Sequence, residues 1–416
     1  MKIIGVEGKI RTETDMILHE FNVDTRPFSQ KVIDCLPKEG KQWRASPEEM
    51  AKRMDLRHLD VCSVDPIGCK DIDDALHCIV LPNGNYEVGV HIADVSHFVK
   101  AGAEIDKEAA RRCTTVYMVD RRTDMLPGLL TETLCSLISD VDRMAFSVIW
   151  EINSATFDVV STKFGKSCIR SRASLNYYKA QEMIDDKSDK SPLTQSLRGL
   201  LRIARVLRNR RVANGALTLA SPELKFKLDN ESQNPTDVSE YLHVDTHFMI
   251  EEFMLLANVA VAERLASYYP SFAILRRHPK PKVKELQDLV DQLTTRGFEV
   301  STESSKALAD SLDRAVSDDP FFNKLVRILA TRCMNQAVYF CMSTVDNAEI
   351  GHYGLAMPKY THFTSPIRRY ADVLVHRLLA ASLDIQSLSN DMVDKFKMAK
   401  QCDQMNRKNR MAALSS

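Results

Sequence analysis

Four aspartates crowd a ten-residue stretch that directly follows an apolar run. Residues 59–64 are followed by Asp65-Pro66-Ile67-Gly68-Cys69-Lys70-Asp71-Ile72-Asp73-Asp74. Pro66 and Gly68 favour a turn that folds Asp65 back toward Asp71. Four carboxylates at this spacing repel one another unless a cation lies between them. Carboxylate oxygens suit magnesium or manganese better than zinc, so the pattern predicts a divalent metal site formed by Asp65, Asp71, Asp73 and Asp74.

This acidic cluster predicts a specific chemistry. Two divalent ions about 3.5–4 Å apart activate a water and stabilise the leaving oxygen of an in-line phosphoryl displacement. A solvated acidic turn and a calcium-binding loop are the alternatives. The calcium hand requires Gly at its sixth position and Glu at its twelfth. Counted from Asp65, these positions hold Lys70 and Leu76, so a catalytic magnesium site is favoured over a calcium hand.

A late segment carries the opposite charge. Residues 360–372 read Tyr-Thr-His-Phe-Thr-Ser-Pro-Ile-Arg-Arg-Tyr-Ala-Asp. Ser365 is suited to cap a helix and Pro366 to be its first residue, which predicts a helix over 367–383. The free N–H groups at such a helix start, together with an arginine, are suited to bind a phosphate.

Two adjacent arginines follow the expected helix start. Arg368 and Arg369 would point about 100° apart on a helix. We therefore expect only one of them to reach the phosphate. The alternative is a capped helix whose arginines pair with Asp372 or with solvent.

Composition narrows the class of protein. The 416 residues include 56 Lys and Arg against 56 Asp and Glu, and this zero formal net charge argues against a chain that coats nucleic acid by bulk charge. The ten Cys are scattered without a Cys-x-x-Cys pair, which favours reduced thiols in the nucleus or cytoplasm. No apolar run approaches the roughly 20 residues of a membrane span, and no signal peptide is evident. We expect a protein that has no membrane segment and only local nucleic-acid contacts.

Apolar patterning divides the chain into four parts. Residues 1–24 suggest two short strands, at 2–10 and 16–23, and 25–56 reads as a linker punctuated by Pro and Gly. Residues 57–385 predict one mixed α/β domain, a β-sheet core flanked by helices. Within it we expect strands at 59–64, 75–81, 86–92, 116–119, 145–152 and 215–228, and helices at 174–212, 247–268, 283–297, 304–316, 321–340 and 367–383, with a final polar helix in 386–416.

Read together, these segments resemble the RNB family of ribonuclease II-like exoribonucleases. Asp65-x5-Asp71-x-Asp73-Asp74-Ala75-Leu76 resembles the family's metal motif, and His91-Ile92-Ala93-Asp94-Val95-Ser96-His97-Phe98 its following signature. Residues 360–377 resemble its C-terminal hallmark. The stretches that look most like the nuclease subunit of eukaryotic RNA exosomes include Thr115-Val116-Tyr117, Met125-Leu126-Pro127 and Leu134-Cys135-Ser136-Leu137.

The resemblance implies a processive 3′→5′ hydrolytic exoribonuclease that degrades single-stranded RNA to nucleoside 5′-monophosphates. Magnesium is the implied cofactor, with manganese as the other candidate. Asp65, Asp71, Asp73 and Asp74 resemble the family's metal-binding quartet, and Asp73 resembles the carboxylate that the reaction cannot spare. Arg368 matches the arginine that holds the scissile phosphate. These five residues are the expected catalytic set.

The resemblance also implies RNA contacts. Tyr177 matches a tyrosine that packs against the terminal nucleotide, although a core aromatic is the alternative from the sequence alone. Glu251 matches a carboxylate near the 3′ end, with its neighbour Glu252 as the other candidate. Arg369 is expected to contact RNA beside Arg368.

Flanking parts and partners follow from the same resemblance. Relatives carry OB-type domains on both sides of the nuclease domain, so 1–24 is expected to be the remnant of one OB-type, cold-shock-like domain, and 386–416 to lead to another. The chain is thus expected to be a fragment, whose full-length form also has the RNA exosome core as a partner. An inactive RNA-binding scaffold and a small-substrate phosphohydrolase are the competing functions.

A basic stripe is visible in the spacing of the residues themselves. It recurs every three to four residues, at Arg198, Arg202, Arg205 and Arg208, and is expected to be either a solvated surface or a phosphate track.

Overall fold

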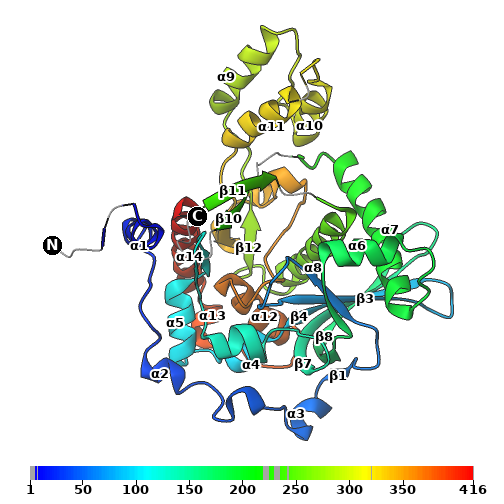
Figure 1. The fold of residues 1–416 in the computed structure, drawn as a ribbon, viewed down its shortest axis with the longest axis vertical. Coiled ribbons are helices and arrows are strands. Elements are labelled where there is room, and N and C mark those ends of the chain that lie inside the picture. The colour runs from blue at the N-terminus through cyan, green and yellow to red at the C-terminus, as the bar shows by residue number, and fades with distance from the viewer. Residues whose placement is uncertain are drawn as a thin grey trace.

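The computed structural model describes residues 5–6, 8–218, 224–228, 235–240, 243–319 and 321–415. In this part of the chain, seven strands form one mixed sheet, which lies in the lower half of Figure 1. The strands follow one another across the sheet in the order β1 (Met54–Asp55), β8 (Val159–Arg170), β7 (Asp142–Ile152), β4 (Tyr86–Ala93), β3 (Asp74–Val80), β2 (Cys62–Asp65) and β9 (Ala173–Asn176). The pairs β1–β8 and β2–β9 are parallel, and the other neighbours are antiparallel. The predicted mixed α/β fold with a sheet core is confirmed.

The central strand β4 is buried on both faces. Residues 88–93 are all buried, although the period-two pattern had placed only alternate apolar residues on one face. The other face carries His91, whose Nε2 lies 2.8 Å from His77 Nδ1 and whose Nδ1 lies 2.7 Å from Ser147 Oγ. These hydrogen bonds satisfy polar groups that burial removes from water.

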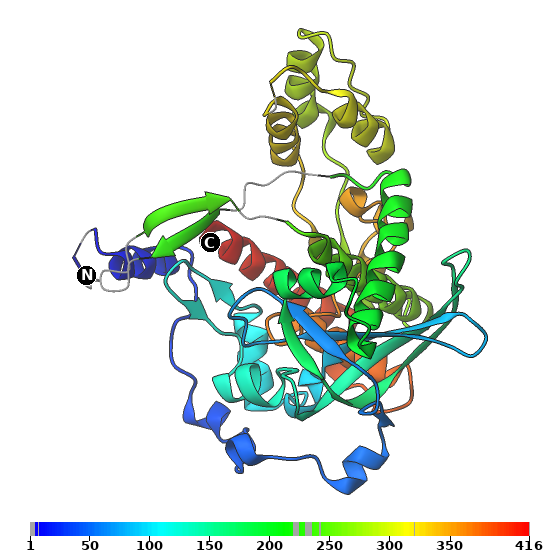
Figure 2. The same ribbon diagram turned by 45° about the vertical axis from the view of Figure 1, so that its right-hand side comes forward.

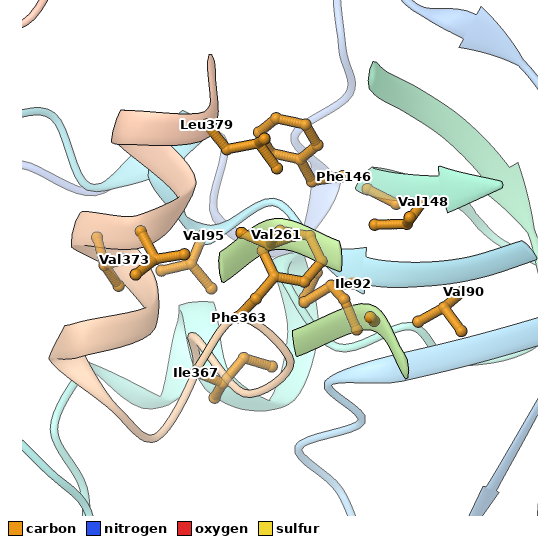
Figure 3. Packing of buried hydrophobic residues seen from close by; sticks show 14 of the residues in the cluster. Val90, Ile92, Val95, Phe146, Val148, Val261, Phe363, Ile367, Val373 and Leu379 are labelled. Carbon is orange, nitrogen blue, oxygen red and sulfur yellow. The ribbon is translucent and has the colours of Figure 1, made fainter. Parts of the chain in front are cut away.

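Two helices build most of the core against this sheet. They are α8 (Asp245–Tyr268) and α12 (Tyr370–Ala381). Figure 3 shows Phe146 of β7 and Phe363 packed together, with Val261 of α8 and Leu379 of α12 nearby. The Phe146 and Phe363 ring centroids lie 5.8 Å apart, edge to face. Phe363 therefore anchors the segment that leads into α12.

Further helices surround the sheet. They are α4 (Val95–Phe98), α5 (Glu104–Arg112), α6 (Tyr177–Asp185) and α7 (Pro192–Ala213). Ser191 caps α7 by accepting from the Thr194 N–H, and Pro192 occupies its first turn, as these residue types favour. The Ser196 hydroxyl accepts from the Cys78 N–H at 2.8 Å, which ties α7 to β3.

Three helices form a lobe that projects from the rest in both views (Figures 1 and 2). They are α9 (Val283–Thr294), α10 (Ser305–Arg314) and α11 (Phe322–Arg332). The lobe has a small core of its own that includes Leu289, Leu308, Leu312 and Val326. The chain enters and leaves it through an antiparallel pair, β12 (Ile274–Arg277) and β13 (Val338–Cys341).

Short elements complete the described chain. Two hairpins are formed by β5 (Val116–Tyr117) with β6 (Arg122–Thr123), and by β10 (Leu224–Leu228) with β11 (Pro235–Glu240). Leu129–Leu134 is a turn of π-helix, and 3₁₀ turns lie at Gly40–Gln42, Met342–Thr344, Asn347–Glu349 and Tyr353–Leu355. Among the described residues, none of the helices combines the length and apolar character that crossing a membrane requires.

The N-terminal segment is helical where strands were expected. α1 spans Ile10–Glu20, so the strand predicted at 16–23 is wrong. Thr14 and Leu18, one helical turn apart, are its buried residues, and Thr14 Oγ1 donates to Asp120 at 3.0 Å. This packing outweighs the β propensity of the local sequence. The other predicted strand, 2–10, lies partly outside the described residues, and its described part is not strand.

The linker and the C-terminal segment both pack on the domain. The linker contains α2 (Gln30–Ile33) and α3 (Pro47–Ala51). It is anchored by Arg53, whose buried guanidinium lies 2.9 Å from Asp94. The C-terminal segment forms α13 (Asn390–Val393) and α14 (Lys395–Ser415), as the predicted polar helix suggested. The apolar face of α14 is buried in the main core through Met398, Cys402 and Met405.

Three other element predictions need correction. The helix expected over 174–212 begins only after β9 and is interrupted between α6 and α7. The helix expected over 321–340 ends at Arg332, because the following apolar residues pair with β12 as β13. In the strand expected over 215–228, residues 215–218 are not strand, 219–223 lie outside the described residues, and β10 begins at Leu224.

The burial of Phe363 predicts a large stability loss on truncation. Phe363→Ala is expected to lower the free energy of unfolding by about 3–5 kcal/mol, because it leaves a cavity beside Phe146. Urea denaturation measures the change. The matched control is Phe321→Ala, because Phe321 is 71% exposed and its truncation should cost less than about 0.5 kcal/mol. Equal losses in the two variants would contradict the assigned core.

Candidate active site

The four aspartates lie on one loop between two paired strands. Asp65 ends β2, and Asp74 begins β3. A tight turn reverses the chain, with the Cys69 N–H donating to the Pro66 carbonyl at 3.1 Å and Gly68 at φ +81°. Glycine tolerates this backbone conformation best. The turn predicted from Pro66 and Gly68 is therefore present.

Ser136 fixes the second half of this acidic loop. Its hydroxyl donates to the Lys70 carbonyl at 2.7 Å and accepts from the Ile72 N–H at 3.1 Å. The Leu137 N–H also donates to the Ile72 carbonyl at 3.0 Å. These bonds hold the loop between Asp71 and Asp73 in place.

The opposite wall of the site is the turn that precedes α12. The Ile367 N–H donates to Asp73 Oδ1 at 3.0 Å, and Arg368 Nε lies 3.8 Å from Asp73 Oδ2. Two segments far apart in the sequence thus meet across one cavity. The juxtaposition of Asp73 with Arg368 that the sequence led us to expect is present.

The helix after this turn begins later than predicted. α12 starts at Tyr370, and the Ser365 carbonyl accepts from the N–H groups of Arg368 and Arg369 in a turn. The Arg368 carbonyl accepts from the Thr115 N–H at 3.0 Å, which is a tertiary bond. Because tertiary bonds to Asp73 and Thr115 engage this backbone, the predicted helix start at Ser365 and Pro366 is wrong.

The two arginines have different environments. Arg369 donates two hydrogen bonds of 2.9 Å to the buried Asp372 carboxylate. Arg368 is 45% exposed and lines the cavity. Arg368 meets the expectation that a single arginine faces the site. Arg369 pairs with Asp372 and does not line the cavity, and its contact with RNA stays a prediction.

A cavity of about 830 Å³ collects most of the predicted residues. This volume suits a nucleotide-sized ligand. The predicted residues that line it are Asp65, Asp71, Asp73, Asp74, Tyr177 and Arg368. Further lining residues with polar side chains that carry no role in the sequence analysis include Tyr117, Arg122, Asp124 and Glu132.

Tyr177 reaches the cavity because of strand register. β2 and β9 pair in parallel, with Asp65 opposite Asn176, so the next residue lies beside the acidic loop. Asn176 caps α6 by accepting from the Lys179 N–H. The Tyr177 ring stacks on His247 of α8, with centroids 4.0 Å apart. One face of the ring is thus supported by an aromatic partner that the sequence did not indicate.

The glutamate pair lies away from this cavity lining. Glu251 is 52% exposed and Glu252 only 3%, and both pair with Arg211 of α7. Neither lines the cavity that holds the aspartates. The role of Glu251 near the 3′ end of RNA stays a prediction, and the buried carboxylate of the pair is that of Glu252. Burial raises the pKa of Glu252, and Arg211 opposes this rise.

Burial disfavours the charged form of three of the aspartates and so raises their pKa values. It raises the pKa of Asp73 to about 8, a rise that Arg368 opposes. Burial and repulsion from Asp71 raise the pKa of Asp65 to about 6. The pKa of Asp74 is raised well above its usual value by burial and by Asp65. The arginines of the site therefore do not offset the cost of burying these three carboxylates in their charged form.

The donor set fits a hard divalent cation. It consists of carboxylate oxygens, and Asp65 Oδ2 is buried without a hydrogen-bond partner in the described structure. No three His, Cys, Asp or Glu side chains of the described residues, however, converge closely enough to hold an ion. Asp71 is engaged by Arg122 at 2.8 Å and by Tyr117 at 3.2 Å. The aspartates would therefore have to rotate to share an ion.

The basic stripe of α7 is largely committed to structural contacts. Arg198 donates to the carbonyls of residues 184, 186 and 189 at the end of α6. Arg205 pairs with Asp245 at 2.6 Å, and Arg208 lies over the Phe248 ring. Arg202 lies over the Phe157 ring. These partners argue against a continuous phosphate track along the stripe.

Residues 53–385 match the RNB domain family. The fold and the acidic site therefore belong to a defined class, and the chain is a member of the RNB domain family. It is 52% identical over 414 residues to the exosome complex exonuclease RRP44 homolog A of Arabidopsis thaliana, covering 99% of this chain and 44% of that protein. It is 51% identical over 410 residues to the exosome complex exonuclease RRP44 of Homo sapiens, covering 98% and 42%. The chain thus spans less than half the length of these curated relatives.

Solved structures share the fold. The structure of Mycoplasma genitalium RNase R in complex with ribose methylated single-stranded RNA superposes with a TM-score of 0.88 at 24% identity, covering all of this chain and 64% of that one. Yeast Ssd1, described as a pseudonuclease, superposes with a TM-score of 0.82 at 24% identity, covering all of this chain and 50% of that one.

The raised carboxyl pKa values predict how the metal-free protein responds to pH. Native Asp73 binds its proton up to about pH 8, whereas an unfolded aspartate releases it near pH 4. The native state holds more protons in this window, so the contribution of Asp73 to stability falls as pH rises. Asp73→Asn, which stays neutral, is expected to gain stability relative to the unchanged chain between pH 5 and pH 8, by at most about 1.4 kcal/mol per pH unit.

Urea denaturation in the presence of a chelator measures this gain. The control is Asp391→Asn, because Asp391 is 74% exposed and its pairing with Lys397 is remote from the cavity. A gain that is the same at pH 5 and pH 8 would contradict the raised pKa of Asp73.

Proposed function

We propose that this chain is a 3′→5′ hydrolytic exoribonuclease that degrades single-stranded RNA processively to nucleoside 5′-monophosphates. Magnesium is its cofactor, and manganese can replace it. The observation that carries the proposal is the position of Arg368 opposite Asp73 across a cavity lined by four aspartates. Membership of the RNB domain family and the exonuclease names of its relatives support it.

The charges in the cavity match a phosphodiester. The exposed Arg368 guanidinium binds the scissile phosphate and holds it above the acidic loop. Asp65, Asp71, Asp73 and Asp74 bind the divalent cations, whose chemistry is to stabilise charge on the phosphate and lower the pKa of the attacking water. Asp73 links the two parts, because its Oδ1 is held by the Ile367 N–H while its Oδ2 faces Arg368.

Tyr177 recognises the RNA chain without reading its sequence. An aromatic face stacks on any base, and Tyr177 lines the cavity of the aspartates while its ring stacks on His247. Contacts to 2′-hydroxyl groups then distinguish RNA from DNA. Advance of the bound RNA chain by one nucleotide after each cut, without release of the chain, gives processive removal of single nucleotides.

The full-length protein acts as part of RNA processing and decay in the nucleus and cytoplasm, with the RNA exosome core as a partner. The names of the relatives support this assignment.

The alternative is a catalytically inactive scaffold that holds RNA. Ssd1 keeps the same fold as a pseudonuclease, so the fold alone does not decide between the two. The presence of all four aspartates and Arg368 in one cavity favours the enzyme. Tight RNA binding without hydrolysis by this chain would support the scaffold instead.

Replacement of Asp73 tests the activity. With magnesium, the chain is expected to shorten a 5′-labelled RNA with a single-stranded 3′ tail to a short oligonucleotide. Asp73→Asn should slow this roughly a thousandfold or more, because several kcal/mol of transition-state stabilisation are lost. Asp391→Asn should leave the rate unchanged. Internal cuts, or DNA cleavage at the same rate, would refute the proposal.

Replacement of Tyr177 tests the stacking contact separately. Tyr177→Ala should weaken binding of a fluorescent single-stranded RNA by about 1–3 kcal/mol, because a base-stacking surface is lost. Fluorescence anisotropy in a chelator measures affinity without degradation. Tyr177→Phe keeps the ring and should bind normally, so an equal loss in both variants would show that stacking is not the contribution of this residue.

A further inference from the structure

The hairpin around β5 and β6 contacts both walls of the candidate site. At its base, the Thr115 N–H and the Thr114 hydroxyl donate to the Arg368 carbonyl at 3.0 and 3.2 Å. Above this base, the Tyr117 hydroxyl donates to Asp71 Oδ2 at 3.2 Å. We call residues 114–124 the bridging hairpin, because it links the turn of Arg368 to the acidic loop.

Arg122 is the basic residue of the bridging hairpin that lines the cavity. Its Nη1 donates to Asp71 Oδ1 at 2.8 Å, its Nε lies 2.5 Å from Asp124 and its Nη2 donates to Glu132 at 3.0 Å. All three guanidinium nitrogens are therefore engaged by carboxylates. Arg122 is 22% exposed, half as much as Arg368. It is thus placed to hold carboxylates and not to grip a phosphate.

The adjacent Arg121 has partners on the other side of the hairpin. It forms ion pairs with Asp15 of α1 and with Asp120. Thr14 of α1 also donates to Asp120. The hairpin is therefore supported from behind by α1, while Arg122 faces the acidic loop. Arg122 thus contacts Asp71, and its neighbour Arg121 contacts α1. Replacing each arginine in turn tests the two contacts separately.

We propose that Arg122 is the positioning residue of Asp71: it fixes the orientation of this carboxylate and balances its charge, so that Asp71 is already in place when the other aspartates turn toward a divalent cation. The inference rests on the proposed function of the acidic site. Without Arg122, the carboxylates of Asp71, Asp124 and Glu132 would repel one another, and Asp71 would keep the hydrogen bonds that it accepts from the Tyr117 hydroxyl and the Cys69 thiol. An Asp71 side chain that is free to rotate loses this freedom when the ion binds. This entropic cost weakens ion binding.

The experiment compares Arg122→Gln with Arg121→Gln, which makes the same change one residue away. Binding of Mn²⁺ in the absence of RNA is measured by electron paramagnetic resonance, and RNA hydrolysis is measured as kcat and KM. Arg122→Gln is expected to weaken Mn²⁺ binding and lower kcat by 10- to 100-fold, the usual effect of removing a partner that orients a metal ligand. KM should change less than threefold. Arg121→Gln should match the unchanged chain in both measurements.

Two results would overturn the proposal. If Arg122→Gln raised KM and weakened RNA binding in a chelator, with unchanged Mn²⁺ affinity, Arg122 would be a phosphate contact. If Arg121→Gln and Arg122→Gln lost Mn²⁺ affinity equally, the effect would be structural. Should Arg122→Gln not fold, Arg122→Lys is measured in its place with an expected loss of three- to tenfold, and unchanged Mn²⁺ affinity in that variant contradicts the proposal. Failure of the unchanged chain to degrade RNA would refute the proposed function alone, because the Mn²⁺ measurement does not depend on hydrolysis.

Discussion

Repulsion among buried carboxylates, opposed by one facing arginine, is the constraint on which the site depends. Asp65, Asp73 and Asp74 are held together on one loop, where burial raises the pKa of each. Arg368 opposes the rise at Asp73 but is itself 45% exposed. Such an arrangement costs stability unless added positive charge enters the cavity. A divalent cation would balance the carboxylates, and a phosphate would balance Arg368. For this reason we assign the site to phosphodiester chemistry.

The fold maintains this arrangement through buried polar contacts that fix backbone as well as side chains. Ser136 bonds to the acidic loop on both sides of Asp71, and Thr115 bonds to the turn that carries Arg368. Deeper in the core, Asp106 pairs with Arg377 at 2.7 Å, which ties α5 to α12. Removing one partner from a buried pair leaves a charge without compensation. The walls of the cavity are thus tied to the core, and side-chain rotation is the motion left to the aspartates.

The sequence predicted the sheet core and the acidic turn, because apolar patterning, local turn chemistry and dense charge are visible in the residues themselves, whereas the grouping of Arg368 with the aspartates came from the resemblance to the RNB family. It failed where tertiary contacts decide the outcome. The start of α12 moved to Tyr370 because Asp73 and Thr115 bind the preceding turn. The strand predicted at 16–23 became part of a helix that packs on a distant loop. The contact between Arg122 and Asp71 spans 51 residues and has no local signal.

Proton release on ion binding tests the central claim most directly. Mg²⁺ or Mn²⁺ is titrated calorimetrically into the metal-free chain at pH 7 in two buffers that differ in ionisation enthalpy. Because burial raises the pKa of Asp73 to about 8 and that of Asp74 well above its usual value, binding should release at least one proton at pH 7 and progressively fewer protons as pH rises above 8. Ion binding that releases no proton at pH 7, or no ion binding at all, would contradict the account.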